Sequence, residues 1–214
     1  MTKIPSIAVF GASGGTGLAL VARIAARGWP ARALVRKEGA AFVQSPRLDI
    51  RVGELLRPED VSSLVKDSDA VCCVFGQRLP ASEVFCAKAT RLVLDAMRTH
   101  GVRRLICVTG AMVGDYPRNR SKACQWASRA VARRLPAVSA DRVEQERLVW
   151  ESGLEWTLVK PPRLTNGPRK GRVVAGPDRR VGLLSKISRS DLAEFILEEI
   201  GRPSFVRQAV FLAG

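Results

Sequence analysis

The sequence has 214 residues, of which 46% are hydrophobic, and it carries a formal net charge of +15. A single domain of this size buries about 70% of the surface that its unfolded chain exposes, so its stability requires neither a disulfide nor a metal. No apolar stretch reaches the roughly 20 residues of a membrane-spanning helix, and residues 1–5 are too polar for a signal peptide. These features exclude an integral membrane protein and favour one cytoplasmic domain, as a monomer or a small homo-oligomer.

The net charge indicates which partners to expect, and the cysteines indicate whether to expect disulfides or a metal site. The 35 basic residues outnumber the 20 acidic ones, which indicates either an arginine-rich solvated surface or an anionic partner such as a phosphate-bearing cofactor, an anionic substrate or nucleic acid. No nucleic-acid-binding motif accompanies the charge, so we expect no nucleic-acid partner. The five cysteines show no CxxC spacing and lie in apolar segments, which predicts buried free thiols and no metal site.

Strand-like and helix-like segments alternate along the chain. We expect strands over residues 6–10, 31–36, 48–52, 69–75, 104–109, 155–160 and 209–212. We expect helices from the glycine-rich turn to Gly28, over 58–66, over 81–100 and over 192–200, the last preceded by a capping box at Ser188 and Asp191. This alternation predicts an α/β fold, a Rossmann-like doubly wound parallel sheet in a single domain.

A glycine-rich turn connects the first expected strand to the first helix. In Gly11-Ala12-Ser13-Gly14-Gly15-Thr16-Gly17, the first glycine permits a tight turn, the second lets a pyrophosphate approach, and Gly17 lets the helix pack on the sheet. The helix N-terminus then supplies free N–H donors. A turn without a ligand is the alternative, but the position after the first strand favours a dinucleotide site at Gly11, Ser13, Gly14, Gly15, Thr16 and Gly17.

The end of the second expected strand indicates which dinucleotide is bound. NAD-specific folds place an acidic residue there to bind the ribose 2′-hydroxyl, whereas this chain has Arg36 and Lys37. A guanidinium can bind two oxygens of a 2′-phosphate. The alternative is that both residues are solvated charges at a strand end, but the missing acid favours NADP(H).

Together these segments resemble the atypical short-chain dehydrogenase/reductases, particularly the biliverdin reductase B / flavin reductase and NmrA-like group. Besides the turn, the resemblance rests on residues 34–36, 69–71 leading to Gly76, 101–102, 107–109, 151–154, 160–162 and 187–192. By resemblance, Glu54 and Leu55 flank the adenine of the cofactor, and its adenosine and ribose side is bordered by Phe75, Gly76, Gln77 and Arg78. The resemblance also implies that Thr109 and Gly110 lie beside the nicotinamide and that the opposite wall is formed by Lys160, Pro161 and Pro162.

The chain departs from this group at three places that bear on catalysis. Gly110 stands where flavin reductases have serine, and Arg163 stands where they have histidine after the paired prolines. The Tyr-x-x-x-Lys pair of the wider superfamily is missing, because the only tyrosine, Tyr116, is followed four residues later by Arg120.

Three residues are candidates for catalysis. Thr109 offers a hydroxyl at the ligand edge, or is simply a β-branched strand residue. Tyr116 is a proton donor if Arg120 or Lys122 lowers its pKa, or else an exposed loop tyrosine. Arg163 binds an anionic group of the acceptor or of the cofactor, or is a solvated loop arginine.

Most of the remaining charged residues form groups along the sequence. Basic residues gather in the two segments expected to hold the substrate, about 110–137 and 161–187, and would steer an anionic acceptor if the segments converge. Glu144 and Glu146 are expected to form solvated ion pairs with Arg142 and Arg147. The single histidine, His100, is expected to end a helix.

The leading hypothesis is an NADPH-dependent reductase that transfers hydride to a small aromatic acceptor, such as a flavin, a quinone or a tetrapyrrole-like molecule. The alternative, which the missing tyrosine–lysine pair favours, is a non-catalytic NADP(H)-sensing regulatory protein of NmrA-like type. A third interpretation, an RNA-associated protein, rests on the basic residues alone.

Overall fold

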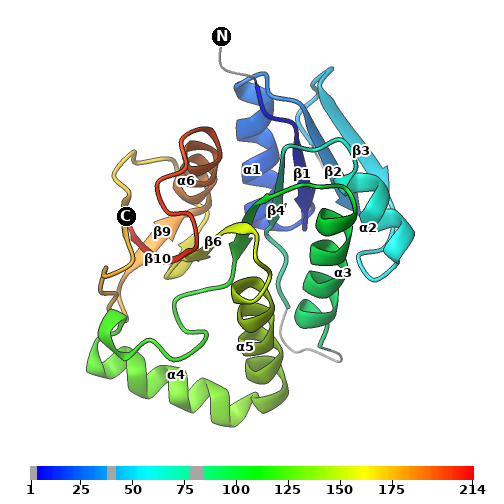
Figure 1. Ribbon diagram of the computed structural model, residues 1–214. Helices are drawn as coiled ribbons and strands as arrows, with labels where there is room; N and C mark the ends of the chain where they lie inside the picture. The colour runs from blue at the N-terminus through cyan, green and yellow to red at the C-terminus, as the bar shows by residue number, and fades with distance from the viewer. Residues whose placement is uncertain (1–3, 38–41, 78–83) are drawn as a thin grey trace.

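The computed structural model describes residues 4–37, 42–77 and 84–214. Its main sheet has eight strands in the order β3-β2-β1-β4-β5-β6-β10-β8 (Figure 1). The strands are β1 (Ile7–Phe10), β2 (Ala31–Val35), β3 (Leu48–Val52), β4 (Ala70–Cys73), β5 (Arg104–Val108), β6 (Glu155–Lys160), β8 (Val174–Gly176) and β10 (Gln208–Ala213). Neighbouring strands are parallel except β10 and β8, which are antiparallel. A second, two-stranded parallel sheet pairs β7 (Arg163–Thr165) with β9 (Lys186–Ser188).

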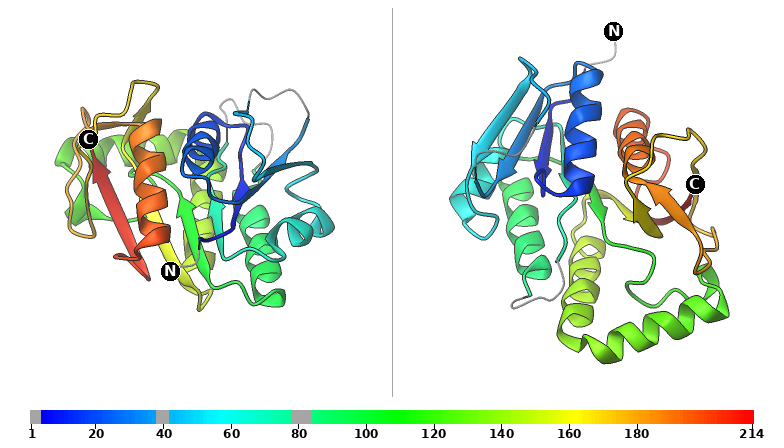
Figure 2. Two further views of the ribbon diagram at one scale, coloured as in Figure 1. Left: turned by 90° about the horizontal axis from the view of Figure 1, so that it is seen from above. Right: turned by 180° about the vertical axis from the view of Figure 1, so that it is seen from behind.

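Helices cover both faces of the main sheet, as the two views of Figure 2 show. They are α1 (Gly15–Ala26), α2 (Pro58–Val65), α3 (Cys86–Thr99), α4 (Lys122–Arg134), α5 (Pro136–Trp150) and α6 (Arg189–Gly201), with a short 3₁₀ helix, η1 (Pro117–Asn119). Helices α1 and α6 lie on one face, and α2, α3 and α5 lie on the other. The predicted doubly wound α/β fold is therefore confirmed.

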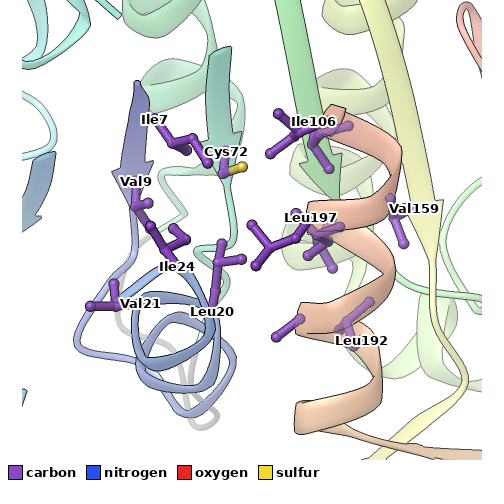
Figure 3. Packing of buried hydrophobic residues seen from close by; sticks show 14 of the residues in the cluster. Ile7, Val9, Leu20, Val21, Ile24, Cys72, Ile106, Val159, Leu192 and Leu197 are labelled. Atoms are coloured by element: carbon purple, nitrogen blue, oxygen red, sulfur yellow. The ribbon is translucent and has the colours of Figure 1, made fainter. Parts of the chain in front are cut away.

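Alternating side chains of the central strands build two separate cores. Ile7 and Val9 of β1 pack with residues of α1 and α6, including Leu20 and Leu197 (Figure 3). Phe10, which points to the opposite face as the two-residue period of a strand requires, packs with residues of α2 and α3. The central strands are thus buried on both faces, which explains why they read as continuous apolar runs in the sequence.

The strand order reverses between β1 and β4. The chain runs outward from β1 through β2 to β3, and then returns to the other side of β1 to begin β4. In open α/β sheets, ligands bind beyond the carboxyl ends of the strands at such a reversal. The topology therefore directs the search for a site to the ends of β1, β4, β5 and β6.

Most predicted elements are found, and the differences have local causes. The final helix begins at Arg189, earlier than predicted, because the Ser188 hydroxyl oxygen accepts from the Asp191 N–H at 3.0 Å and caps the helix there. The helix predicted over 81–100 is described from Cys86 to Thr99. His100 follows that helix and its ring nitrogen contacts the Ser62 hydroxyl at 2.8 Å, so its helix-end position is confirmed.

No bounds were predicted for helices α4 and α5, and the short strands β7, β8 and β9 were not predicted. The residues that α5 buries include the polar Gln145 and Glu146, and α4 buries only Cys124, so neither helix carries the apolar stripe on which a sequence prediction depends. All five cysteines are free and buried, as expected. Within the described ranges, no helix has both the length and the apolar character required to cross a membrane.

Candidate dinucleotide and acceptor site

The glycine-rich turn has the geometry of a phosphate cradle. At Gly11, which has φ +87°, an added Cβ would lie 2.6 Å from the backbone nitrogen of Phe75 at the end of β4. At Gly17, a Cβ would overlap the backbone of Gly11 and Ala12. Both glycines are therefore required by the fold itself.

Gly14 differs from these two glycines because its outer side is open. Its N–H donates to the Gly11 carbonyl at 3.1 Å and closes the turn. A Cβ at Gly14 would have one protein atom within 4 Å, the Gly11 carbonyl oxygen at 3.3 Å. Helix α1 follows directly, and the N–H groups of its first turn have no carbonyl partner within the helix. Open space in front of N–H donors fits the pyrophosphate of a dinucleotide.

Arg189 belongs to this cradle, although sequence reasoning did not find it. A Cβ at Gly15 would lie 2.8 Å from the Nε atom of Arg189, so this side chain lies against the first turn of α1. Its Nη1 atom donates to the Asn166 side-chain oxygen at 2.5 Å, which holds the guanidinium in place. Arg189 is separated from the turn by more than 170 residues, and no local pattern in the sequence brings the two together.

We expect Arg189→Ala to weaken NADP(H) and NAD(H) binding by the same factor. The pyrophosphate is common to both cofactors, and a charge-assisted hydrogen bond contributes about 1.5–3 kcal/mol, or about 10- to 100-fold in the dissociation constant. Fluorescence titration with both cofactors measures this. Arg202→Ala, at the opposite end of α6, is the control and should change neither constant. A loss restricted to NADP(H) would show that Arg189 contacts the 2′-phosphate instead.

The residues predicted for the adenosine side lie at the ends of β2, β3 and β4. Arg36 and Lys37 follow β2 and are both exposed. Glu54 and Leu55 follow β3, and the Glu54 N–H donates to the Asp60 carboxylate at 2.8 Å, which fixes this turn. Past β4, Phe75 is buried, whereas Gly76 is exposed and Gln77 is half-buried; Arg78 lies outside the described residues.

The basic pair after β2 leads to a prediction about cofactor choice. We expect NADP(H) to bind at least tenfold more tightly than NAD(H), a difference of about 1.4 kcal/mol, and Arg36→Ala to remove most of this preference. Dissociation constants of both cofactors for both proteins test it. Equal constants in the unmutated protein would contradict the assignment of Arg36 and Lys37 to the 2′-phosphate.

The two segments expected beside the nicotinamide lie next to each other. The Thr109 N–H donates to the Val159 carbonyl at 3.0 Å, and the Ala111 N–H donates to the Pro161 carbonyl at 2.9 Å. These hydrogen bonds extend the pairing of β5 and β6 beyond the strands and place Gly110 opposite the paired prolines. The segment 109–111 and the Lys160-Pro161-Pro162 segment therefore form one stretch of the carboxyl edge.

A buried polar cluster lies directly behind this edge. Its centre is the Glu146 carboxylate, which accepts from the Thr109 hydroxyl at 2.6 Å, from the Tyr116 hydroxyl at 3.1 Å and from the Lys160 ammonium. Lys160 also donates to the Val113 carbonyl at 3.1 Å. Lys160 is fully buried and Glu146 is only 5% exposed. We call these four side chains, Thr109, Tyr116, Glu146 and Lys160, the Glu146 cluster.

The prediction of a solvated Glu146 was therefore wrong. Glu144 does pair with Arg147 on the surface, at 2.7 Å, but Glu146 lies two residues further along α5 and points to the opposite side, toward the carboxyl edge. Arg142 is likewise no surface partner. Its Nη2 atom donates to the Thr109 carbonyl at 2.5 Å and its Nη1 atom to the Phe75 carbonyl at 3.4 Å, so it joins the ends of β4 and β5.

Burial shifts the ionisation of this cluster. Desolvation lowers the pKa of Lys160 to about 8, and the attraction of Glu146 offsets only part of this effect. The pKa of Tyr116 is raised by burial first and then by the Glu146 charge and hydrogen bond, while Arg120 lowers it by less. The sequence-based condition for Tyr116 as a proton donor, a pKa lowered by Arg120 or Lys122, is thus not met. Tyr116 is half-buried, not an exposed loop residue.

A cavity of about 290 Å³ opens beside this edge, between residues 112–117 and helices α4 and α5. Its lining includes Met112, Pro117 and Val143 together with Arg120 and Arg129. Arg120 is 3% exposed, and its guanidinium donates to the Ala111 carbonyl at 2.7 Å and to the Ser128 hydroxyl at 3.0 Å. The cavity therefore combines apolar walls with two arginines and one carboxylate, Asp115.

The two basic segments, about 110–137 and 161–187, lie next to each other, which is the condition under which they would steer an anionic acceptor. The Val181 N–H donates to the Asn119 carbonyl at 2.9 Å, and the Ser121 N–H donates to the Val181 carbonyl at 3.0 Å. This pairing brings residues 118–120 next to residues 179–180. Arg163 is exposed at the start of β7, directly after the paired prolines.

Comparison with known proteins identifies the family. Residues 11–203 match the family model described as NAD(P)H-binding. The chain belongs to this NAD(P)H-binding family. An uncharacterised chloroplastic protein of Arabidopsis thaliana is 28% identical over 210 residues, covering 92% of this chain and 72% of that protein.

Solved structures share the fold over nearly the whole chain. A Burkholderia pseudomallei protein described as exported is 26% identical, with a TM-score of 0.77 over 98% of this chain and 100% of that one. ChuY, an anaerobilin reductase of Escherichia coli O157:H7, is 22% identical, with a TM-score of 0.80 over 97% and 96%. A short-chain dehydrogenase/reductase of Veillonella parvula, solved with NADP, is 16% identical, with a TM-score of 0.79 over 98% and 94%. The Rossmann-like architecture is thus common to proteins that have diverged widely in sequence.

Proposed function

We propose that this protein is an NADPH-dependent reductase that transfers hydride to a small aromatic acceptor, such as a flavin, a quinone or a tetrapyrrole-like molecule. The observation that carries the proposal is the position of the Thr109 hydroxyl, held by the buried Glu146 carboxylate at the carboxyl edge of the sheet. NADPH, when bound, supplies the hydride. The chain's own residues bind the cofactor, orient the acceptor and stabilise the negative charge that forms on it.

The charges around the edge support an acceptor that is anionic or becomes anionic. Arg120 and Arg129 line the cavity between residues 112–117 and helices α4 and α5, and we assign Arg163 to the rim of the acceptor site because it follows Pro162 directly. Apolar side chains of the same cavity, including Met112 and Val143, suit the faces of an aromatic ring. We expect the reaction to take place in the cytoplasm, without a nucleic-acid partner, in a monomer or small homo-oligomer.

One observation favours the alternative, a non-catalytic NADP(H) sensor. The hydroxyl protons of Thr109 and Tyr116 are both donated to Glu146, so each is engaged within the protein. A sensor would bind NADPH and its oxidised form with different affinities and report the difference to a partner.

Turnover distinguishes the two functions. NADPH oxidation is followed by absorbance with a panel of flavins, quinones and a linear tetrapyrrole, at enzyme concentrations high enough to detect slow catalysis. The reductase proposal expects saturable oxidation that depends on one acceptor class. Tight binding of both cofactor forms with no oxidation by any acceptor would reject it in favour of the sensor.

A further inference from the structure

We propose that the Glu146 cluster is a proton relay, in which Lys160 stores the proton, Glu146 passes it on and the Thr109 hydroxyl delivers it to the acceptor after hydride has arrived. This inference rests on the proposed reductase function and deepens it. It implies an acceptor that must be protonated at the reacting end before release, and not merely one that accepts electrons.

The relay has an unbroken path of hydrogen bonds. The Glu146 Oε1 atom accepts from both the Lys160 ammonium and the Thr109 hydroxyl, the latter at 2.6 Å. One carboxylate oxygen thus connects the fully buried ammonium to a hydroxyl at the edge of the sheet. Tyr116 lies on the other carboxylate oxygen, Oε2, at 3.1 Å. Tyr116 is therefore a side branch that orients Glu146, and it is not on the path from Lys160 to Thr109.

Positively charged side chains surround the Glu146 carboxylate and affect how readily Lys160 releases its proton. The groups that face Lys160 from the elements around it are Glu146 and Arg142 of α5, Arg120 and Tyr116 of the segment before α4, and Cys107 of β5. Among them are two cationic side chains, Arg120 and Arg142, and one carboxylate, Glu146. Together with Lys160 the group therefore contains three cations and one anion. Desolvation by burial lowers the pKa of Lys160 most, the charge and hydrogen bond of Glu146 oppose this shift, and the positive charges of Arg120 and Arg142 add to it. Lys160 therefore releases its proton more readily than an exposed lysine, as a proton donor requires.

The step balances in atoms and charge. The acceptor gains hydride from NADPH and becomes an anion. The Thr109 hydroxyl, which donates to Glu146 at rest, turns toward this anion. Its O–H bond then breaks as a bond from the proton to the acceptor forms, and the Thr109 oxygen regains a proton from Glu146 as Glu146 takes one from Lys160. The net result is a protonated acceptor and a neutral Lys160 amine, which recovers its proton from water before the next turnover.

Removal of the delivering hydroxyl is the first arm of the test. Thr109→Val keeps the shape of the side chain and is expected to lower kcat about 100-fold or more, the usual contribution of a positioned acid, with NADPH affinity unchanged. Thr109→Ser should restore most of this loss. Thr99→Val, at the far end of α3, is the matched control. Because Tyr116 lies off the path, Tyr116→Phe should cost only a few-fold, and a thousandfold loss would overturn the relay.

The pH profile is the second arm. In the unmutated protein kcat should fall about tenfold per pH unit above pH 8, as Lys160 loses its proton. Lys160→Arg keeps the charge but does not release a proton in this range, so kcat should be low at every pH and the falling limb should disappear. A falling limb that persists unchanged in Lys160→Arg would overturn the relay and leave the reductase function standing.

A third arm needs no turnover. The Lys160 side chain is titrated by carbon-13 NMR of labelled lysine, with its signal assigned from Lys160→Arg, and a midpoint near pH 8 is expected. The absorbance of Tyr116, the only tyrosine of the chain, shows in each variant that the cluster is intact, because a Tyr116 displaced from its buried site would ionise at lower pH. A Lys160 that keeps its proton above pH 10 would overturn the relay. If no acceptor is reduced, the reductase function fails while this titration still reports on the cluster.

Discussion

Gly14→Val is expected to abolish measurable NADP(H) binding, a loss of at least about 100-fold or about 2.7 kcal/mol, in a protein that remains folded. The outer side of Gly14 is the open side of the cradle, where a Cβ meets only the Gly11 carbonyl oxygen. A branched side chain there would occupy the space that the pyrophosphate needs. The backbone of Gly14 is extended, with φ −76° and ψ 161°, so valine fits the local conformation. Isothermal titration with NADPH and thermal unfolding measure the two effects.

Gly17→Val is the informative comparison. A side chain at Gly17 overlaps the backbone of Gly11 and Ala12, so this variant should have a lower free energy of unfolding even in the absence of cofactor. The pair separates a glycine required by the ligand from one required by the packing of α1 on the sheet. Normal NADPH binding by Gly14→Val would mean that the cofactor does not lie on this turn.

The residues that we assign to the cofactor could be proposed from the sequence because their determinants are local. The turn joins one strand to the next helix within a few residues, and Arg36 and Lys37 end the following strand, so spacing along the chain places all of them at one edge. Apolar runs revealed the central strands because these are buried on both faces. Arg189 could not be found in this way, since only the packing of α6 beside α1 brings it to Gly15.

The residues that we propose for catalysis were harder to find because they come from four separate segments. Thr109 follows β5, Tyr116 lies in the next loop, Glu146 is on α5 and Lys160 ends β6. The sequence shows Glu144 and Glu146 among arginines, and a helical surface is the simplest interpretation of that pattern. Residues two apart on a helix point in different directions, so one glutamate reaches solvent and the other reaches the edge. Only the position of α5 against β6 decides which glutamate is buried.

The same burial makes Glu146 important for the stability of the fold. Removing one partner of a buried ion pair leaves the other charge without compensation, which typically costs about 3–5 kcal/mol. Glu146→Leu should lower the free energy of unfolding by this amount at pH 7, because the Lys160 ammonium would lose its counter-charge while fully buried. Thr109 and Tyr116 would lose their acceptor as well. Urea unfolding at pH 7 measures the change.

The double variant and the pH dependence distinguish charge burial from lost packing. Glu146→Leu combined with Lys160→Met removes both charges and should recover most of the stability, since an apolar pair often replaces a buried ion pair without penalty. In the Glu146→Leu single variant the folded-state pKa of Lys160 lies below its unfolded value, so the unfolded chain binds more protons and stability rises with pH. The defect should therefore be largest at low pH and should shrink as pH rises to about 8, where Lys160 of the unmutated protein also loses its proton and both proteins respond to pH alike. A defect of constant size, unrelieved by Lys160→Met, would mean that Glu146 stabilises the fold through its packing and not through Lys160.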